Sequence, residues 1–273
     1  MNEASLEITA QKADALRGVH GGPRLLVLPN AWDAASARAF EKAGFLAIAT
    51  TSGGVAAALG FEDHEAAPVE EMLAAAQRIV AAVSVPVTVD FEAGYELAPE
   101  EVARRLISIG AAGLNFEDSD HRSGGTLVHL ERQAERLSAI KAAGQAEGVD
   151  LVLNARIDVF IRRAGTADEQ LSDGLRRARL YRQAGADCIY PITLSDQTMI
   201  AQFVDAVQVI NVNLRRGGAI SLDQAARLGV RRVSYATSLF REALAFTEQL
   251  AGEVRAEVTA LPSHSTAPEI TKP

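Results

Sequence analysis

The chain has 273 residues, of which 48% are hydrophobic and 23% charged, a composition typical of a globular protein and not of a disordered one. Its 35 acidic and 27 basic side chains give a net charge of −8, which disfavours nucleic acid as a partner. The single cysteine, Cys188, excludes an intramolecular disulfide, and no apolar run is long enough to span a membrane, so we expect a protein of the reducing cytoplasm.

Short apolar runs rich in β-branched residues recur along the chain, and each is followed by a longer segment with helical periodicity. Eight of these runs are predicted to be strands, at 25–28, 47–50, 86–89, 113–116, 151–155, 188–190, 207–212 and 232–234. They are apolar almost throughout, as expected of parallel strands that are covered on both faces. Helices are predicted between them, at 33–43, 68–82, 99–109, 130–146, 167–184, 196–203 and 222–228.

This alternation of eight strands and helices matches the size of a (β/α)8 TIM barrel, an α/β fold. A doubly wound open sheet is the alternative, but its nucleotide-binding form needs a glycine-rich turn after the first strand, and residues 29–33 contain no glycine. We expect one barrel domain at 1–260, with an extra N-terminal helix at 5–17 and a C-terminal helix from 238 to about 258. The tail at 261–273 contains Ser, Thr and Pro and is expected to be disordered.

Acidic side chains follow two neighbouring strands, and in barrel enzymes the chemistry occurs at these C-terminal strand ends. Asp90 and Glu92 come after the third strand and are two residues apart, which places them on the same side of an extended strand. Glu117 follows the fourth strand, and Arg156 follows the fifth. A cluster of oxygen ligands alone favours Mg²⁺ or Mn²⁺ held partly through water. The alternative is a structural network in which these carboxylates pair with Arg156.

Two loops after the strands are candidates for substrate binding. Residues 51–54 (TSGG) offer consecutive backbone N–H groups that suit a carboxylate or a phosphate, although small residues also form ordinary turns. Residues 117–126 are polar and too long for a tight turn, so they are predicted to form a mobile lid. His121 in this lid is a candidate site residue. The other histidines are predicted to lie on the surface, namely His20, His64, His129 and His264. Cys188 is predicted to lie in the core.

Several stretches, taken together and in this order, resemble the isocitrate lyase and phosphoenolpyruvate mutase superfamily. They are LPNAWDAASA at 28–37, TSG at 51–53, LGFED at 59–63, VDFEAGY at 89–95, FED at 116–118, NAR at 154–156 and LGVRRVSY at 228–235. The resemblance implies a TIM barrel whose last helix is swapped between the subunits of a homodimer or homotetramer. It also implies Mg²⁺ as cofactor, and small 2-oxo acids, or carboxylates that cleave to them, as substrates.

The same resemblance implies a role for each motif. The implied metal site consists of a direct ligand and two holders of metal-bound water: Asp90, then Glu92 and Glu117. The implied substrate carboxylate site consists of backbone groups and one arginine: Thr51, Ser52, Gly53 and Arg156. Asp63 would contact metal-bound waters or the reacting group, so the candidate catalytic residues are Asp63, Glu117, His121 and Arg156. The far end of the substrate would meet residues that follow the later strands: Asn211, Asn213 and Tyr235.

The lid departs from the superfamily pattern. Its isocitrate and 2-methylisocitrate lyases carry a Lys-Lys/Arg-Cys-Gly-His motif, whereas residues 119–125 (SDHRSGG) contain neither lysine nor cysteine. We predict a Mg²⁺-dependent lyase that cleaves a C–C bond in a small 2-oxo or 2-hydroxy di- or tricarboxylate, similar to isocitrate, 2-methylisocitrate or oxaloacetate, through a metal-stabilised enolate. The alternatives are a hydrolase or phosphonomutase acting on oxaloacetate or phosphonopyruvate, with His121 or Arg122 replacing the missing lid groups, a 2-oxo-acid-binding barrel with weak catalysis, and a phosphate-binding barrel that uses residues 215–218.

Overall fold

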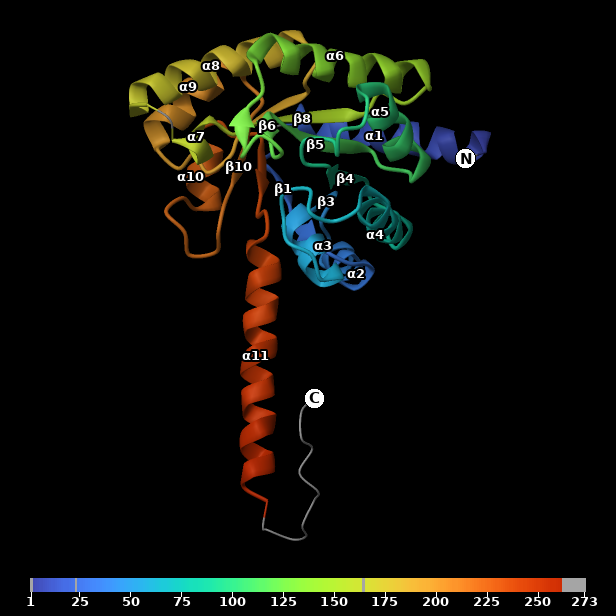
Figure 1. Cartoon of the computed structure of the whole chain (residues 1–273), viewed down its shortest axis with the longest axis vertical. Helices are drawn as coiled ribbons and strands as arrows, with labels where there is room; N and C mark the ends of the chain where they lie inside the picture. Colours follow the sequence, from blue (N-terminus) through green and yellow to red (C-terminus); the bar gives the residue numbers. More distant parts are fainter. Residues whose placement is uncertain (1, 23, 164, 262–273) are drawn as a thin grey trace.

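The computed structural model describes residues 2–22, 24–163 and 165–261, and parallel strands form its centre (Figure 1). A strand is present at each of the eight predicted places. The strands are β1 Leu26–Leu28, β2 Asn30–Ala31, β3 Ile48–Thr50, β4 Val87–Asp90, β5 Gly113–Glu117, β8 Val152–Ile157, β9 Cys188–Pro191, β10 Asn211–Asn213 and β11 Arg232–Ser234. The predicted seventh strand began too early, because Val207 still belongs to a helix. The predicted tail lies outside the described residues, apart from Leu261.

The strands close into a ring. One group has the order β2-β3-β4-β5-β8-β9 and the other the order β1-β11-β10, and all these pairs are parallel. Pro29 alone separates β1 from β2, where a proline cannot donate to the ladder. A parallel bridge between Ile189 and Ile210 connects β9 with β10. The predicted (β/α)8 barrel is therefore confirmed, and the alternative of an open doubly wound sheet is wrong.

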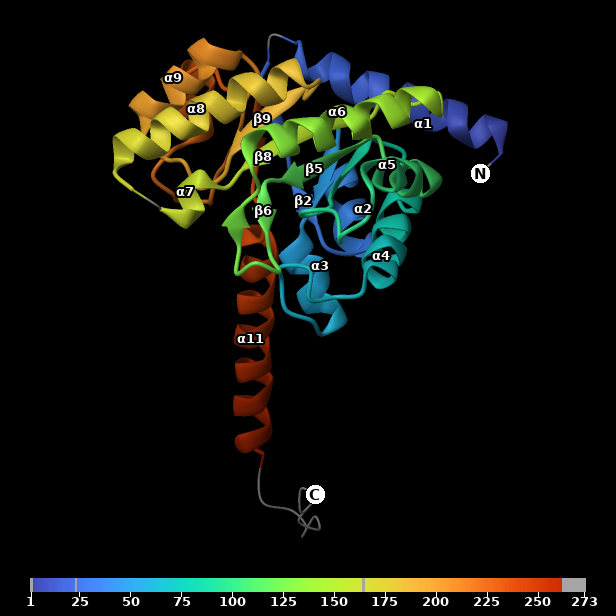
Figure 2. The same ribbon diagram turned by 45° about the horizontal axis from the view of Figure 1, so that its top comes forward.

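Helices surround this ring of strands (Figures 1 and 2). They are α1 Glu3–His20, α2 Ala34–Lys42, α3 Ser52–Leu59, α4 Val69–Ala81, α5 Pro99–Ser108, α6 Leu130–Ala146, α7 Val159–Arg162, α8 Ala167–Gln183, α9 Gln197–Val207, α10 Leu222–Arg227 and α11 Ser238–Thr259. The predicted helices are present, and their ends differ by a few residues. Two helices were not predicted, α3 and α7, because α7 is a single turn and α3 begins with the poor helix formers Ser-Gly-Gly.

Helix α1 covers the N-terminal ends of strands β8 and β9. Its Arg17 contacts Asp187 at 2.9 Å, just before β9 begins. At the end of α1, His20 is buried, with 4% of its surface exposed, and its Nδ1 is 2.9 Å from the carbonyl oxygen of Leu16. The prediction of a surface position for His20 is therefore wrong, because the barrel covers the end of α1 where this side chain lies. His129 and His64 are exposed, as predicted, and His264 lies outside the described residues.

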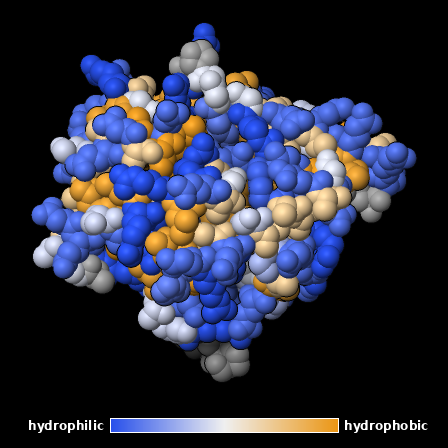
Figure 3. All heavy atoms as spheres, turned by 90° about the horizontal axis from the view of Figure 1, so that it is seen from above, coloured by the Kyte–Doolittle hydropathy of each residue, from blue (hydrophilic) through white to orange (hydrophobic). Residues whose placement is uncertain are grey.

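The core fills the barrel and the space between strands and helices, and Cys188 is part of it. This thiol is fully buried, and burial raises its pKa to about 12, so the prediction of an unreactive core cysteine is confirmed. The surface on the side away from α11 is largely hydrophilic, with several apolar patches among the hydrophilic residues (Figure 3).

Helix α11 differs from the other long helices because none of its residues is buried. It extends away from the barrel (Figure 1). Several of its large apolar side chains are exposed, namely Leu244, Phe246, Leu250, Val254 and Val258. Four of them recur every four residues and therefore share one face of the helix. Within the described residues, no helix is long and apolar enough to cross a membrane.

Candidate functional site

The predicted acidic residues and Arg156 lie together at the C-terminal ends of three adjacent strands. Asp90 ends β4, Glu117 ends β5, and Arg156 lies opposite Glu117 in the parallel register of β5 and β8. Glu92 joins this group for a reason other than the predicted one. Strand β4 ends at Asp90, and Glu92 lies in the following turn with a φ of 47°. The turn therefore brings Glu92 to the cluster, and the argument from strand alternation does not apply to it.

Arg156 is buried and contacts carboxylates on both sides. Its Nε donates to Asp158 at 2.7 Å, and a second guanidinium nitrogen donates to the other oxygen of Asp158 at 3.1 Å. Its remaining terminal nitrogen forms an ion pair with Glu117. Asp158 is itself fixed by the Ser119 hydroxyl at 2.5 Å, and its backbone N–H donates to Asp118 at 2.8 Å. The predicted structural network of carboxylates around Arg156 is therefore present, and this network fixes the orientation of the Arg156 guanidinium.

The cluster holds more negative charge than its one arginine neutralises. Burial raises the pKa of Asp90, partly offset by the Arg156 charge, and it raises the pKa of Glu117 well above its usual range. Burial also raises the pKa of Glu92 to about 8. One oxygen of Asp90 and one of Asp63 are buried without a hydrogen-bond partner among the described residues. A cluster of carboxylate oxygens with excess negative charge suits a hard divalent cation such as Mg²⁺ or Mn²⁺.

Residues 51–54 form the start of helix α3, where the sequence predicted a backbone cradle for an anion. Thr51 is the N-cap residue, and its hydroxyl accepts from the N–H of Gly54 at 3.4 Å. The N–H of Ser52 donates to Asp90 at 3.0 Å, so this donor holds a carboxylate of the protein. A Cβ atom on Gly53 would lie 2.6 Å from the Asp63 carboxylate, so a larger residue there would displace this side chain. Asp63 therefore lies against the N-terminus of α3, beside the cluster.

The predicted lid is an antiparallel hairpin of β6 Ser119–Asp120 and β7 Thr126–Leu127. The Asp120 side chain accepts from the N–H groups of Arg122 and Ser123 at 3.1 and 3.2 Å, and these bonds shape the tip. His121 begins the tip, and its Nε2 lies 2.6 Å from the Glu117 carboxylate. The hairpin therefore places one imidazole in direct contact with the acidic cluster.

Hydrogen bonds orient the three residues that were predicted for the far end of the substrate. Asn211 is buried inside the barrel, and its amide donates to Ser234 at 3.0 Å. Asn213 accepts from the backbone N–H of Thr193 at 2.9 Å and lines a different hollow. The backbone N–H of Tyr235 donates to Asn30 at 2.7 Å. The residues that follow β3, β4, β5 and β8 contact one another directly, and the role of these three stays a prediction.

Two side chains at the barrel mouth were not proposed from the sequence. The Tyr95 hydroxyl donates to Glu92, and His64 lies beside His121, with ring centroids 5.1 Å apart. Both line a hollow of about 380 Å³ together with Glu65 and Arg122. Tyr95 is the last residue of the VDFEAGY motif, so the motif carried a signal for it. His64 follows Asp63 directly, and only its position next to an acidic candidate could have indicated it.

Comparisons with known proteins agree with this geometry. The family model of phosphoenolpyruvate phosphomutase matches residues 16–255. The 2-methylisocitrate lyase of Escherichia coli K12 is 33% identical over 233 residues, covering 80% of this chain and 76% of its own. A crystal structure from Burkholderia cenocepacia J2315 is 37% identical with a TM-score of 0.83, covering 89% of this chain and 99% of that chain. The crystal structure of 2,3-dimethylmalate lyase is 25% identical with a TM-score of 0.79, and the match covers 93% of this chain and 91% of that chain.

These similarities extend over most of the barrel and include the strand ends that carry the acidic cluster. The chain therefore belongs to the phosphoenolpyruvate phosphomutase family, within the isocitrate lyase and PEP mutase superfamily of metal-dependent carbon–carbon lyases and mutases.

Proposed function

We propose that the protein is a Mg²⁺-dependent lyase that cleaves a C–C bond in a small 2-oxo or 2-hydroxy di- or tricarboxylate. The observation that supports this most is the group Asp90, Glu92 and Glu117, which faces Arg156 at the barrel mouth. Glu92 and Glu117 are buried, and Asp90 is half-buried. Asp90 would be the direct ligand, and Glu92, Glu117 and Asp63 would hold its water molecules. Bound Mg²⁺ would attract the carboxylate and carbonyl oxygens of a 2-oxo acid and offset the charge of an enolate.

The residues of the chain would orient the substrate and move a proton. Arg156 presents a guanidinium whose direction is fixed by Asp158, so it can face a substrate carboxylate without reorganising. The first turn of α3, at Thr51, Ser52 and Gly53, would direct the positive end of its helix dipole toward the same carboxylate. His121, in contact with Glu117, is placed to move a proton between the lid and the cluster.

One test of this proposal is a substrate panel of oxaloacetate, isocitrate, 2-methylisocitrate and phosphonopyruvate, each with Mg²⁺ and with EDTA. We expect turnover of at least one compound with Mg²⁺, its loss in EDTA and its recovery when Mg²⁺ is added back. Asp90→Asn should lose this turnover, whereas Glu96→Gln, an exposed carboxylate near the mouth, should keep it. If none of the compounds reacts, the lyase proposal is wrong. Binding of a 2-oxo acid in calorimetry would then support the barrel with weak catalysis.

The contact between His121 and Glu117 favours a second candidate, a hydrolase or phosphonomutase of the same superfamily. In that case the imidazole would replace the lid groups that residues 119–125 lack. His121→Ala should then abolish turnover and leave the binding of a 2-oxo acid intact. In water labelled with oxygen-18, hydrolysis places the label in a carboxylate or phosphate group of a product, and a lyase reaction does not. A phosphonomutase is recognised instead by a product that is an isomer of its substrate. Full activity of His121→Ala would exclude this candidate.

We also propose that the protein is a cytoplasmic homodimer or homotetramer in which α11 packs against a second copy. The exposed apolar face of α11, formed by Phe246, Leu250, Val254 and Val258, supports this proposal. The free buried thiol of Cys188 fits a reducing compartment. The barrel would form a single domain, 1–260, with α1 and α11 as its terminal helices.

A further inference from the structure

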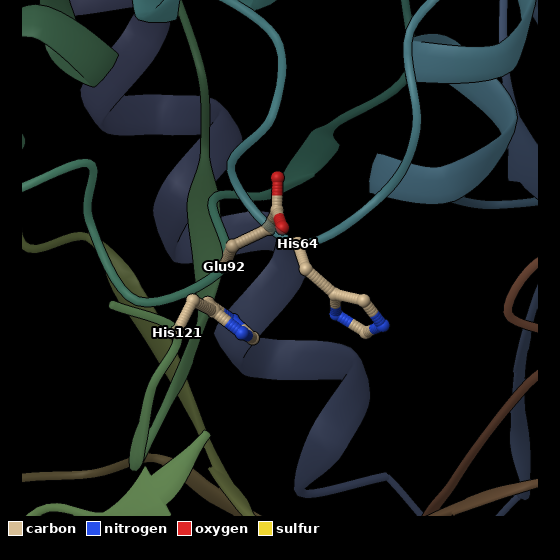
Figure 4. A group of neighbouring side chains, drawn as sticks. All are labelled: His64, Glu92 and His121. Carbon is tan, nitrogen blue, oxygen red and sulfur yellow. The ribbon is translucent and has the colours of Figure 1, made fainter. Parts of the chain in front are cut away.

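Two imidazoles and one carboxylate meet at the barrel mouth, next to the acidic cluster. His64 lies in the loop between α3 and α4, Glu92 in the turn after β4, and His121 at the tip of the lid hairpin. Figure 4 shows these three side chains beside one another. One possible ligand atom from each lies within 4.8 Å of the other two. A mixed set of nitrogen and oxygen ligands differs in kind from the group around Asp90, which supplies oxygen alone.

Contacts outside the group orient His121 as metal-ligating histidines usually are. Its Nε2 is 2.6 Å from the carboxylate of Glu117, which leaves Nδ1 as the nitrogen available to a ligand. A carboxylate that contacts Nε2 fixes the tautomer and the direction of the ring, and it makes Nδ1 a stronger metal ligand. Arg122, the cation that lines the same hollow, forms an ion pair with Glu96.

The loop that carries His64 is held over Glu92. His64 and Glu65 have φ values of 71° and 59°, a left-handed conformation that few side chains adopt without a cost. The backbone N–H of Glu65 donates to Glu92 at 2.8 Å, and the Glu65 carboxylate accepts from the N–H of Tyr95 at 2.6 Å. Such strain is retained where the surrounding contacts determine the conformation, and it is concentrated at functional sites.

We propose that His64, Glu92 and His121 bind one divalent transition-metal ion of the Zn²⁺, Co²⁺ and Ni²⁺ class. Imidazole nitrogen suits these ions, whereas Mg²⁺ requires oxygen ligands. Zn²⁺ bonds to nitrogen are about 2.0–2.1 Å long, so the ligand atoms, which lie within 4.8 Å of one another, would move closer on binding. The exposed side chain of His64 leaves room for this movement. Water or a substrate carboxylate would complete the coordination.

The bound ion would connect the loop of His64 to the lid hairpin, across the hollow at the mouth. It would also engage Glu92, which the proposed function assigns to the water molecules of Mg²⁺. Occupancy of this second site therefore closes the mouth and withdraws Glu92 from the catalytic group. In this respect the inference rests on the proposed function, and inhibition of the Mg²⁺-supported reaction by Zn²⁺ is its consequence.

Calorimetric titration of the full-length protein with Zn²⁺, in excess Mg²⁺, tests the site itself. We expect one Zn²⁺ per chain in the wild type, and binding weaker by more than about 100-fold in His64→Asn, because loss of a direct ligand exceeds the loss of an outer-shell partner. Asn tolerates the left-handed backbone at this position. His129→Asn is the matched control, since His129 is 82% exposed and paired with Glu131 outside the group. It should bind as the wild type does.

Co²⁺ provides a second readout, because its visible absorption bands change when nitrogen ligands replace water. These bands should appear in the wild type and in His129→Asn, and not in His64→Asn or His121→Asn, with folding of each variant checked by circular dichroism. Equal Zn²⁺ binding by the wild type and His64→Asn would overturn the inference. Zn²⁺ binding without any turnover of the substrate panel would support the second metal site and refute the lyase proposal. Mg²⁺-dependent turnover without Zn²⁺ binding would support the lyase proposal and refute the second metal site.

Discussion

Arg156 contacts buried carboxylates on two sides, and this limits what can replace it. Lysine is a point charge and cannot keep the two bonds to Asp158 together with the ion pair to Glu117. For Arg156→Lys we expect kcat/KM on the accepted substrate to fall by roughly 100-fold or more, the loss typical of a preorganised donor. Arg176→Lys is the control, because Arg176 is exposed and paired with Asp173. Wild-type kinetics in Arg156→Lys would contradict its proposed role.

His20 is a residue whose burial makes stability depend on pH. Burial, together with the nearby positive charge of Arg232, lowers its pKa from 6.5 to about 4. The unfolded chain binds more protons between these two values, so this contribution to stability is complete above pH 6.5 and is lost as the pH falls toward 4.

Comparison with His20→Asn isolates this contribution. From pH 7 to pH 5 we expect the wild type to lose about 2 kcal/mol more of its unfolding free energy than the variant does. Urea denaturation followed by circular dichroism at each pH measures the difference. Parallel pH profiles for the two proteins would show that His20 titrates normally and is not buried in solution.

At the scale of elements, the contact between strands β5 and β8 depends on one small residue. A Cβ atom added to Gly113 would lie 2.3 Å from the carbonyl oxygen of Val152 and 2.9 Å from its Cβ. Both atoms belong to Val152 in strand β8, which cannot move without disturbing the ladder that holds Glu117 opposite Arg156.

Gly113→Ala should therefore lower the unfolding free energy by about 1–3 kcal/mol or more, as overpacking does. Gly18→Ala is the matched substitution, because Gly18 lies in α1 and nothing is within 4 Å of the added atom. We expect it to be neutral or to stabilise by up to about 1 kcal/mol through helix propensity. Urea midpoints compare the two, and equal stability of both variants would refute the close packing of β5 against β8.

Helix α3 shows where local prediction was incomplete. Its first residues, Ser52 and Gly53, have low helix propensity, and the sequence alone suggested a turn. The helix forms because Thr51 caps it and because its apolar residues Val55 and Ala56 are buried against neighbouring elements. Packing overrides propensity there, and the result is a helix N-terminus beside Asp63 and Asp90 where a loop was expected.

For the whole molecule, the exposed apolar face of α11 makes association with a second copy testable. Leu250→Glu places a charge on this face, and burying an unpaired charge in an interface is costly. We expect light scattering after gel filtration to report a smaller assembly for Leu250→Glu than for the wild type at equal concentration. Gln249→Glu changes the charge equally at the next residue and should keep the wild-type mass. A monomeric wild type would refute the association.

The sequence by itself determined the alternation of eight strands with helices, because strand length, apolar runs and helical periodicity are local properties. It also placed Asp90, Glu117 and Arg156 at strand ends, and parallel strands bring such ends to one rim. Burial was not decided locally, as His20 shows: one face of α1 is apolar enough to pack, but only the barrel beneath it determines which side chains are covered.

The tertiary structure alone decided the closure of the ring, since the bridge from Ile189 to Ile210 depends on the twist accumulated over all the strands. It also brought His64 to His121, although they lie in separate loops with no shared motif. The physical reason is the same in each case. Distances between segments far apart in the chain are set by packing, which no local pattern of residues encodes.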